Sequence, residues 1–416
     1  MTSAARHGPS ARGIRSVGFW LIVVAASANY SVNAAAAPLL TRGTLEVLGQ
    51  DAAAAGGLVA ITGITAIVAM AAAGVAADRV GPKTVAVAAS VLAIAGVGLL
   101  IVSFTVPSIA VSRLAYGAGN AGVTIATTSW VALSTPHHQR GRALGYYGIS
   151  VWVGLAAGPL LAENLYAWAG NSAAWAGMAI LQVMALGIAA LVASTPTVHP
   201  ADARKESGPA SPESLTAAAL RRSLARAVWV PAVISLAAWG AQGLLTAFLV
   251  LHLQAQGMPA SGVGGAATIF VVFAASVVVA RIALGAATDR IAVTSTARAS
   301  LAVVAAGLSV IAFAPTFWWA AAGAAVLGVG YAPLYPTLTL MATAPLPPAR
   351  QSTAIGFFSA ATALGMAVGP ALGGLSITAT SSTVAFVGAA VVQLAVIPVV
   401  RFSAPARETA PQATRA

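Results

Sequence analysis

The stretch GVAADRVGPK, Gly74 to Lys83, lies in a short polar gap between two long apolar runs. A second copy, GAATDRIAVT, begins 211 residues later at Gly285. The same offset joins further glycines and prolines without a gap: Gly96 with Gly307, Gly117 with Gly328, Gly119 with Gly330, Pro136 with Pro347, Gly145 with Gly356, Gly154 with Gly365, Gly158 with Gly369 and Pro159 with Pro370. One offset that holds over about ninety positions predicts two structurally equivalent halves.

The composition excludes a soluble globular domain. Hydrophobic residues make up 59% of the chain and charged residues 7%, and the mean hydropathy is +0.88. Soluble domains carry about 25% charged residues. The net charge is +12, but the basic residues stand singly between apolar runs, so we do not expect nucleic-acid binding. The chain has no cysteine, which excludes disulfides and thiol chemistry.

The apolar runs predict an all-helical membrane protein, because about 20 apolar residues are needed to cross ~30 Å of hydrocarbon. The first run follows a basic tail as a secretory signal would, but it is too long and carries Asn29 and Asn33, so we expect an uncleaved helix. Twelve spans are predicted, near residues 17–40, 53–77, 84–105, 108–133, 143–164, 173–194, 228–251, 262–284, 299–314, 317–342, 352–375 and 382–400.

These spans predict two six-helix bundles, residues 17–194 and 228–401, between cytoplasmic tails 1–16 and 402–416. Residues 195–227 connect the bundles. Their prolines and charges indicate a solvated linker, whereas the helix start at Ser211–Pro212 and the leucines and arginines after it fit a short basic helix on the inner leaflet. The sequence leaves both open.

Lysine and arginine set the expected orientation, because they concentrate on the cytoplasmic side. With a cytoplasmic N-terminus, all but three of the 21 basic residues lie in cytoplasmic segments or at cytoplasmic helix ends. The exceptions are Arg42, outside, and Arg113 and Arg281, within spans. Both termini are therefore expected in the cytoplasm of a bacterial cell, with the chain in the inner membrane as a monomer surrounded by lipid.

The Gly74–Lys83 stretch resembles the signature loop between the second and third helices of the major facilitator superfamily. The resemblance runs from about Val17 to Arg401. Within that superfamily, Arg140–Tyr166 and Leu327–Leu340 are similar to the arabinose-efflux-like, drug:proton antiporters of bacteria. The resemblance implies two six-helix bundles around a central cavity and transport by alternating access.

The resemblance assigns the loop motif to an inner latch that gates transport. Physically, a glycine lets a neighbouring helix come close, and Asp78 is suited to the positive end of a helix dipole. A turn between spans needs small and charged residues anyway, so topology alone is the simpler explanation. The second copy departs from the motif at Ala292 and Thr294, which predicts a weaker latch. The expected latch residues are Gly74, Asp78, Arg79, Gly81, Lys83, Gly285, Asp289 and Arg290.

Two charged residues in spans are candidates for proton coupling. Arg113 within the fourth span is costly in hydrocarbon and tends to be functional, although it is near enough to the outer end to snorkel. The resemblance makes Arg113 part of the coupling machinery. Glu163, at the outer end of the fifth span, is the one carboxylate near a span and away from the cytoplasmic loops. We expect the two to pair; the alternative is that Glu163 caps its helix in water.

The motif G-x-x-x-G-P at Gly154, Gly158 and Pro159 marks antiporters in the resembling family. Close helix packing at small residues, with a proline kink, explains it equally well. Its copy at Gly365, Gly369 and Pro370 makes it less specific for export.

Polar and aromatic residues near mid-span are candidates for a substrate cavity, because transporters of this kind bind ligand between their repeats. Each one separately is as well explained by a helix–helix hydrogen bond. They are Asn29, Asn33, Asn120, Trp239, Gln242, Tyr331 and Tyr335. Arg281, at the inner end of the eighth span, is either a cytoplasmic anchor or, if it faces the cavity, a sign of an anionic substrate.

The spans, the repeat and the family resemblance predict secondary active transport. The form of transport that we expect is proton-coupled export of a small organic compound. Uptake or exchange of an organic anion is the alternative, and a non-transporting membrane sensor of the same fold is a third. We expect no enzyme activity, cofactor or metal, because the sequence shows no nucleotide loop, metal-ligand cluster or Ser-His-Asp pattern.

The topology can be tested by labelling, because the chain has no cysteine of its own. Cysteines at Gln50 and Gln256 should react with an impermeant thiol reagent in intact cells, whereas cysteines at Gln139 and Ser207 should not. Labelling with the reverse pattern would overturn the expected orientation.

Overall fold

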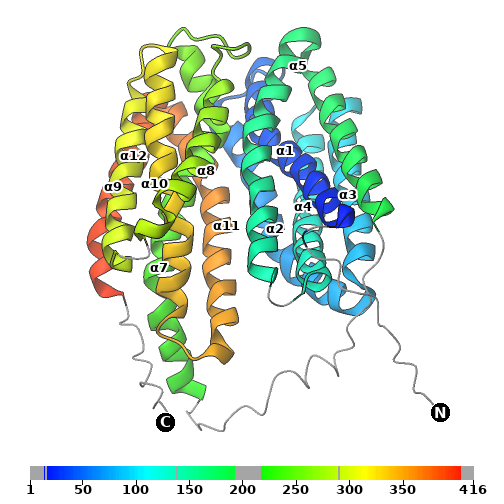
Figure 1. Cartoon of the computed structure of the whole chain (residues 1–416). Helices are drawn as coiled ribbons and strands as arrows, with labels where there is room; N and C mark the ends of the chain where they lie inside the picture. Colours follow the sequence, from blue (N-terminus) through cyan, green and yellow to red (C-terminus); the bar gives the residue numbers. More distant parts are fainter. Residues whose placement is uncertain (1–13, 15, 137–138, 193–216, 289–290, 404–416) are drawn as a thin grey trace, which may run out of the picture. The chain divides into compact units, whose positions relative to one another are not determined.

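The computed structural model describes residues 14, 16–136, 139–192, 217–288 and 291–403. Over these residues the chain forms eleven α-helices and one 3₁₀ helix and no strand, so the all-helical prediction is confirmed (Figure 1). The helices are α1 (Val17–Glu46), α2 (Ala52–Val80), α3 (Pro82–Val102), α4 (Val106–Ser134), α5 (Arg140–Leu191), α7 (Ala217–Ala255), α8 (Thr268–Thr288), α9 (Val293–Ala312), α10 (Phe317–Thr343), α11 (Pro348–Ala379), α12 (Ser382–Val396) and η2 (Ile397–Phe402).

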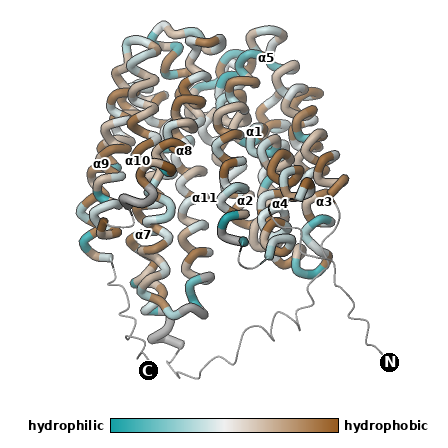
Figure 2. Tube along the Cα trace, in the orientation of Figure 1, coloured by the Kyte–Doolittle hydropathy of each residue, from teal (hydrophilic) through white to brown (hydrophobic). Residues whose placement is uncertain are grey.

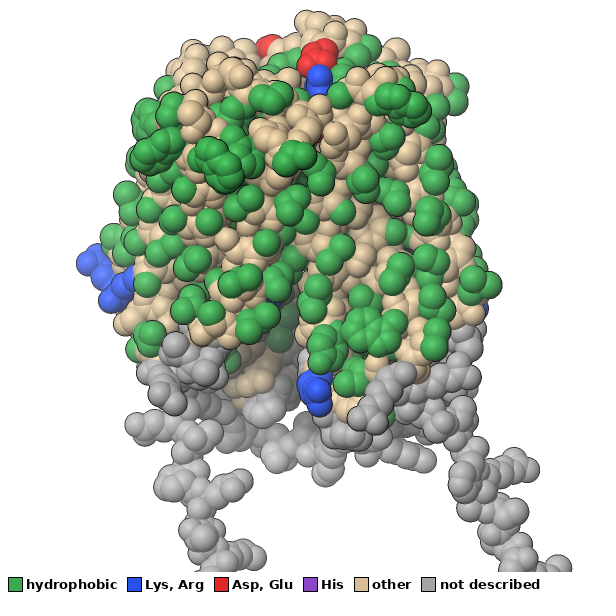
Figure 3. Space-filling view, turned by 45° about the horizontal axis from the view of Figure 1, so that its top comes forward, with side chains coloured by type: hydrophobic (Ala, Val, Ile, Leu, Met, Phe, Trp, Pro, Cys, Tyr) green, Lys and Arg blue, Asp and Glu red, His purple; other side chains and the backbone are tan. Residues whose placement is uncertain are grey.

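Nine helices within the described residues are long and apolar enough to cross a membrane. Figure 2 shows the matching hydropathy, with hydrophilic residues gathered mainly toward helix ends. Large aliphatic side chains are exposed on the helices, Val68 by 73% and Ile282 by 80%, and hydrophobic side chains cover much of the face in Figure 3. Such a surface suits lipid. The protein is therefore a multi-pass membrane protein.

The helix α5 covers two of the twelve predicted spans. It has 52 residues, but its backbone leaves the helical region at Ala169 and Gly170. Gly170 has φ +79°, a backbone conformation that residues other than glycine rarely adopt. The two arms on either side correspond to the predicted spans 143–164 and 173–194, which accounts for eleven helices where twelve were predicted.

Two other boundaries differ from the prediction. The helix α7 begins at Ala217, so residues 217–227 are its first turns rather than a linker or a separate surface helix. Leu224 packs there against a buried cluster of Ala227, Val228, Leu346 and Ala354. The helix α8 begins at Thr268, six residues later than predicted, because Gly262 turns the chain with φ +89° and its carbonyl accepts a hydrogen bond from the Thr268 hydroxyl. The rest of the expected linker and most of both terminal tails, residues 1–13, 15 and 404–416, lie outside the described residues.

The residues cluster into two compact units, Met1–Gly43 with Ile64–Glu206, and Thr44–Gly63 with Ser207–Ala416. The helix α2 thus contributes to both. Its first part belongs to the second unit, where Gly56 lies against the Pro370 carbonyl of α11, and the Ala53 N–H donates to the Thr378 hydroxyl at 3.0 Å.

The 211-residue repeat reappears as matching glycine contacts within each unit. In the first unit, a Cβ added to Gly119 of α4 would lie 2.6 Å from the backbone nitrogen of Ala93 on α3. In the second unit, a Cβ added to Gly330 of α10 would lie 2.9 Å from the backbone nitrogen of Val304 on α9. Gly119 and Gly330 are 211 residues apart, and so are Ala93 and Val304. Backbone touches backbone at equivalent places, so the two helix pairs have the same local packing.

Substitution of these glycines tests the packing. Gly119→Ala should lower the free energy of unfolding by about 1–3 kcal/mol, because the added methyl meets backbone that cannot move aside. Gly98→Ala on α3 is the matched control, since nothing lies within 4 Å of its added Cβ. The measurement is the midpoint of thermal unfolding in detergent. An equal effect of both substitutions would contradict the packing argument.

Candidate functional site

The first loop motif forms a tight turn between α2 and α3. Gly81 is buried and has φ +86°, so glycine is required there. Lys83 donates from Nζ to the carbonyl of Val192 at 2.7 Å. This carbonyl is at the C-terminal end of α5, where the helix dipole stabilises a positive charge. Asp78 and Arg79 are exposed. No described atom lies within 4 Å of a Cβ on Gly74, so the expected close approach of a helix there is not found in this structure.

The second copy of the motif is only partly described. Gly285 lies within α8, while Asp289 and Arg290 lie outside the described residues. At Ala292, where the first copy has Gly81, φ is −56°. The second turn is thus built differently, which is the physical reason that it needs no glycine.

Glu163 forms an ion pair with Arg42, in which Nη1 of Arg42 donates a hydrogen bond to Oε2 of Glu163. The predicted pairing of Glu163 with Arg113 is therefore wrong in this structure. The Glu163 side chain is fully buried, and that of Arg42 is 17% exposed. The guanidinium of Arg42 also lies 4.0 Å above the ring of Tyr166. Glu163 does not cap its helix in water, and its partner is the residue that sequence analysis had placed outside.

Arg113 is fully buried between aromatic rings instead. Its guanidinium carbon lies 4.9 Å from the ring centre of Tyr116 and 5.3 Å from that of Trp175. One nitrogen, Nη2, donates to the hydroxyl of Ser112 at 3.0 Å. Nε and Nη1 have no hydrogen-bond partner within the described part of the chain. Burial excludes snorkelling, and cation–π contact leaves the charge only partly compensated.

Three predicted cavity residues meet in an amide network of the first unit. Asn29 donates from Nδ2 to Asn120 at 2.9 Å, and Asn120 donates to Asn33 at 3.1 Å. Gln182, in the second arm of α5, donates to Asn29 at 3.0 Å. Chains of side-chain amides in a low-dielectric interior strengthen one another. The network ties α1, α4 and α5 together, and Asn33 and Asn120 remain partly exposed.

Sequence analysis missed Gln182, although the repeat contained a signal for it. Gln393 stands 211 residues later, and it donates to the carbonyl of Ala237 on α7 at 3.0 Å. Both glutamines are fully buried. The two glutamines stand at the same offset as the glycines and do the same thing in both units. Each one attaches the last helix segment of its unit to the first helix of that unit.

The antiporter-motif glycines allow close helix packing in each unit. Added Cβ atoms on Gly154 and Gly158 would meet the backbone of α1 at Ser31. Those on Gly365 and Gly369 would meet the backbone of α7 at Gly240. Pro159 and Pro370 lie inside α5 and α11. The packing explanation of this motif is thus sufficient in both units.

The predicted cavity residues of the second unit form an aromatic cluster. The ring centre of Trp239 lies 6.1 Å from that of Tyr331 and 5.7 Å from that of Tyr335, both edge-on. The hydroxyl of Tyr331 donates to the carbonyl of Ala238. Gln242, one turn further along α7, is partly buried. The cluster offers ring edges and faces rather than amides.

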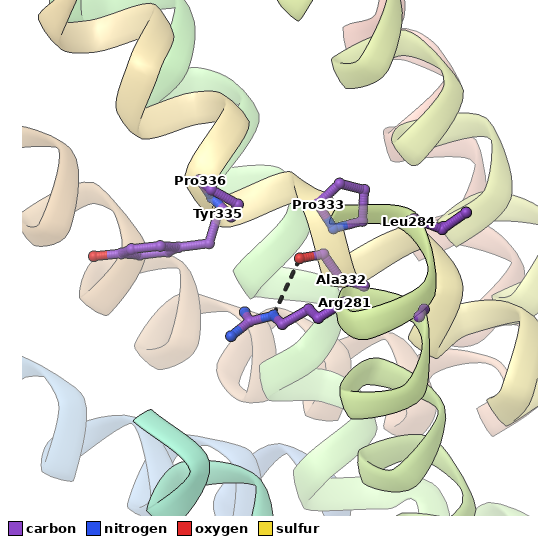
Figure 4. A pocket seen from close by; sticks show the side chains of 7 residues that line it. Arg281, Leu284, Ala332, Pro333, Tyr335 and Pro336 are labelled. Atoms are coloured by element: carbon purple, nitrogen blue, oxygen red, sulfur yellow. Dashed lines mark hydrogen bonds between the residues drawn. The ribbon is translucent and has the colours of Figure 1, made fainter. Parts of the chain in front are cut away.

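Arg281 lines a pocket in the second unit (Figure 4). The pocket has a volume of about 270 Å³, and α8 and α10 supply its walls: Ala280, Arg281, Leu284, Ala332, Pro333, Tyr335 and Pro336. Nε of Arg281 donates to the carbonyl of Ala332 at 3.2 Å. Arg281 is exposed, and this bond holds its side chain against α10 beside the pocket. Within the described residues no group of three His, Cys, Asp or Glu side chains could hold a metal.

Comparisons with known proteins agree with this architecture. The family model described as Major Facilitator Superfamily matches residues 19–292 and 261–416. An uncharacterized MFS-type transporter, YhhS of Escherichia coli, is 24% identical over 353 residues, which is 83% of this chain and 82% of the relative.

Solved structures show the same fold. A POT family transporter in complex with 5-aminolevulinic acid has a TM-score of 0.76 at 14% identity, over 94% of this chain and 97% of the other. A variant of the nucleoside transporter NupG has a TM-score of 0.75 at 13% identity, over 92% and 99%. The helical repeat, the loop motif and the family match together show that this chain is a transport protein that belongs to the Major Facilitator Superfamily.

Proposed function

We propose that this transporter exports a small organic compound in exchange for protons, and that Glu163 carries the proton. The supporting observation is the buried ion pair of Glu163 with Arg42. A carboxylate inside a membrane protein is costly and tends to be functional. Protonation of Glu163 removes its charge and so releases Arg42, which links proton binding to a change in helix contacts between α1 and α5. The likeness to drug:proton antiporters supports the same direction.

In this proposal the chain lies in the inner membrane as a monomer with both termini in the cytoplasm. The latch is the Gly74–Lys83 motif with its second copy at Gly285, Asp289 and Arg290. Each unit offers its own candidate substrate contacts: the first has the amide network with Asn29, Asn33 and Asn120, and the second has the cluster of Trp239, Tyr331 and Tyr335 with Gln242. Amides and aromatic rings suit a ligand that is largely apolar with few polar groups.

A second candidate function is uptake or exchange of an organic anion. Arg113 supports it, because two of its buried nitrogens have no partner within the described residues. The hydroxyl of Tyr116 beside it is also buried and has no hydrogen-bond partner within the described residues. Buried guanidinium and phenol donors without a hydrogen-bond partner in the described residues suit the carboxylate of a ligand.

The proton carrier is tested in inverted vesicles with a pH-sensitive dye. Proton movement is followed after addition of ethidium as an organic cation, chloramphenicol as a neutral compound or benzoate as an anion. Glu163→Gln should abolish substrate-induced proton movement, and Arg42→Gln should reduce it strongly. If the pair is coupled, Arg42→Gln should lower substrate-induced proton movement in the wild-type background and add little in the Glu163→Gln background.

Glu46→Gln is the control, because Glu46 is an exposed carboxylate beyond Arg42 on the same helix. It should leave proton movement unchanged. Full proton coupling in Glu163→Gln would refute Glu163 as carrier. Uptake of radiolabelled benzoate into the same vesicles without a proton gradient, and unchanged in Glu163→Gln, would favour the anion function.

The latch is tested by Asp78→Asn. The variant should fold and insert but transport less, because the proposed latch stabilises one of two conformational states of the transport cycle. Each tenfold change in the ratio of these two states corresponds to about 1.4 kcal/mol. Thr84→Ala, exposed in the same turn, is the control and should transport normally. Normal transport by well-expressed Asp78→Asn would remove the gating role.

A further inference from the structure

The second unit buries one histidine, His252, near the C-terminal end of α7. Its side chain is fully buried. No other Asp, Glu, His, Lys or Arg side chain that the structure describes in that unit is buried. Sequence analysis passed over it, because a single histidine within an apolar run belongs to no motif. The contacts of its two ring nitrogens show what it can do.

The two ring nitrogens of His252 contact two other helices. Nε2 lies 3.1 Å from the carbonyl oxygen of Ile311, at the C-terminal end of α9. A carbonyl only accepts hydrogen bonds, so Nε2 carries a hydrogen. Nδ1 lies 2.8 Å from the hydroxyl of Ser382, the first residue of α12, and in the neutral ring it accepts from that hydroxyl. Nδ1 is therefore the nitrogen that can take up a proton.

Protonation of Nδ1 breaks neither contact. A hydroxyl both donates and accepts, so the Ser382 hydroxyl can turn and accept from Nδ1–H while Nε2 still donates to Ile311. Burial opposes the positive charge. The charge lies at the C-terminal end of α9, where the helix dipole stabilises a cation, and the ring centre of Phe386 is 4.7 Å from that of the histidine. The site therefore accommodates both the neutral and the protonated ring.

A proton has a short path to Nδ1. Ser382 is partly exposed, and Ser381 before it is exposed. The Ser382 hydroxyl can pass its own hydrogen to Nδ1 while its oxygen takes a hydrogen from water, and the oxygen then accepts from the new N–H. One proton enters, and both hydrogen bonds of the ring are kept. In the proposed orientation, this end of the unit faces the outside.

Other charged groups lie far from the ring along their helices. Arg298 on α9 stands 13 residues before Ile311, which is about 20 Å along the helix axis. The helices α10 and α12 contain no charged residue. The other described arginines on α7 and on the elements packed against it lie toward the opposite helix ends: Arg222, Arg226, Arg350 and Arg401.

Other groups that could titrate do not touch the ring either. The described carboxylates of this unit, Glu46 and Asp51, are exposed. The phenol of Tyr331 on α10 donates to Ala238, nearly four turns before His252 on α7. Titration of His252 therefore depends on Ser382, on the end of α9 and on burial.

The repeat places His252 close to the position of the proposed proton carrier. At the 211-residue offset His252 corresponds to Thr41, the residue before Arg42, which pairs with Glu163. The second unit has no such ion pair, because the equivalents of Arg42 and Glu163 are Leu253 and Gly374. Each unit thus has one buried group that can take up a proton at the C-terminal end of its first helix.

We propose that His252 is a second proton-binding site of this transporter, in the second unit, and that it is loaded from the outside through Ser382. The proposal rests on the proton-coupled function and adds a proton that Glu163 does not carry. Protonation turns the bond from Nε2 to Ile311 into a charge-assisted one, which is stronger. The protonated ring therefore holds the ends of α7 and α9 together more firmly than the neutral ring does.

Nitrogen-15 NMR of the histidine-labelled full-length protein tests the site without substrate or gradient. The chain has five histidines, and the signal that is lost in His252→Gln belongs to His252. As the pH is lowered from about 8 to about 5, this signal should change from a ring protonated at Nε2 alone to a ring protonated at both nitrogens. A His252 signal that stays constant in the folded protein over this range would overturn the proposal.

Ser382→Ala tests the contact at Nδ1 in a variant that keeps the histidine. Hydrogen bonds to a charged group are stronger than those to a neutral one, so loss of the hydroxyl should move the titration midpoint about 0.5–1 pH unit lower. Ser309→Ala on α9 is the matched control, because the Ser309 hydroxyl donates to the carbonyl of Ala305. Its midpoint should match the wild-type value. Equal midpoints in the two variants would show that Ser382 is no part of the site.

The use of this proton in transport is measured in inverted vesicles, where the outer end of the chain faces the lumen. Substrate-induced proton movement is followed with the dye at a series of lumenal pH values. The wild-type profile should have a step at the midpoint found by NMR, which Ser382→Ala should shift and His252→Gln should lose. An unchanged profile in His252→Gln would exclude this proton from transport.

The two proton sites are separable in these experiments. Full proton coupling in Glu163→Gln would remove Glu163 as carrier and leave the NMR titration of His252 as it is. A constant His252 signal together with lost coupling in Glu163→Gln would remove the second site alone.

Discussion

Direct contact between helix backbones at glycine is the interaction on which both units of this transporter depend. Lipid is as apolar as leucine, so burial of apolar surface drives little association between helices, and close packing must do so instead. Gly119 and Gly330 provide this contact at positions related by the repeat. Gly158 and Gly369 do the same against α1 and α7. The glycines therefore decide which helices pair, and the paired helices place the polar residues.

Arg42, Arg113 and Arg281 have three different physical environments. Arg42 has a carboxylate, Glu163. Arg113 has two aromatic rings and a hydroxyl. Arg281 donates to the backbone carbonyl of Ala332. The carboxylate beside Arg42 makes a pair that protonation can break, whereas two nitrogens of Arg113 have no hydrogen-bond partner in the described residues and can donate to an anion. The two functions that we consider for this chain follow from this difference.

The repeat, the helices and several site groupings could be predicted because they depend on local or periodic signals. Twelve apolar runs follow from hydropathy, and the glycine offset predicted equivalent halves. The mid-span asparagines Asn29, Asn33 and Asn120 were grouped by depth alone, and they meet in one network. The partner of Glu163 was predicted wrongly, because two arginines lie at similar depth and depth does not tell which face of each helix carries them.

By itself, the sequence determined the fold family, the positions of the spans and the residues that lipid makes costly. Length, hydropathy and a fixed repeat suffice for that, since each span must satisfy its own backbone. Only the tertiary structure decided how the helices are rotated about their axes. That rotation pairs Glu163 with Arg42 rather than Arg113, brings Gln182 onto Asn29, and turns Arg281 toward the Ala332 carbonyl. These contacts join residues from separate helices, and their geometry depends on packing that no single stretch of the chain encodes.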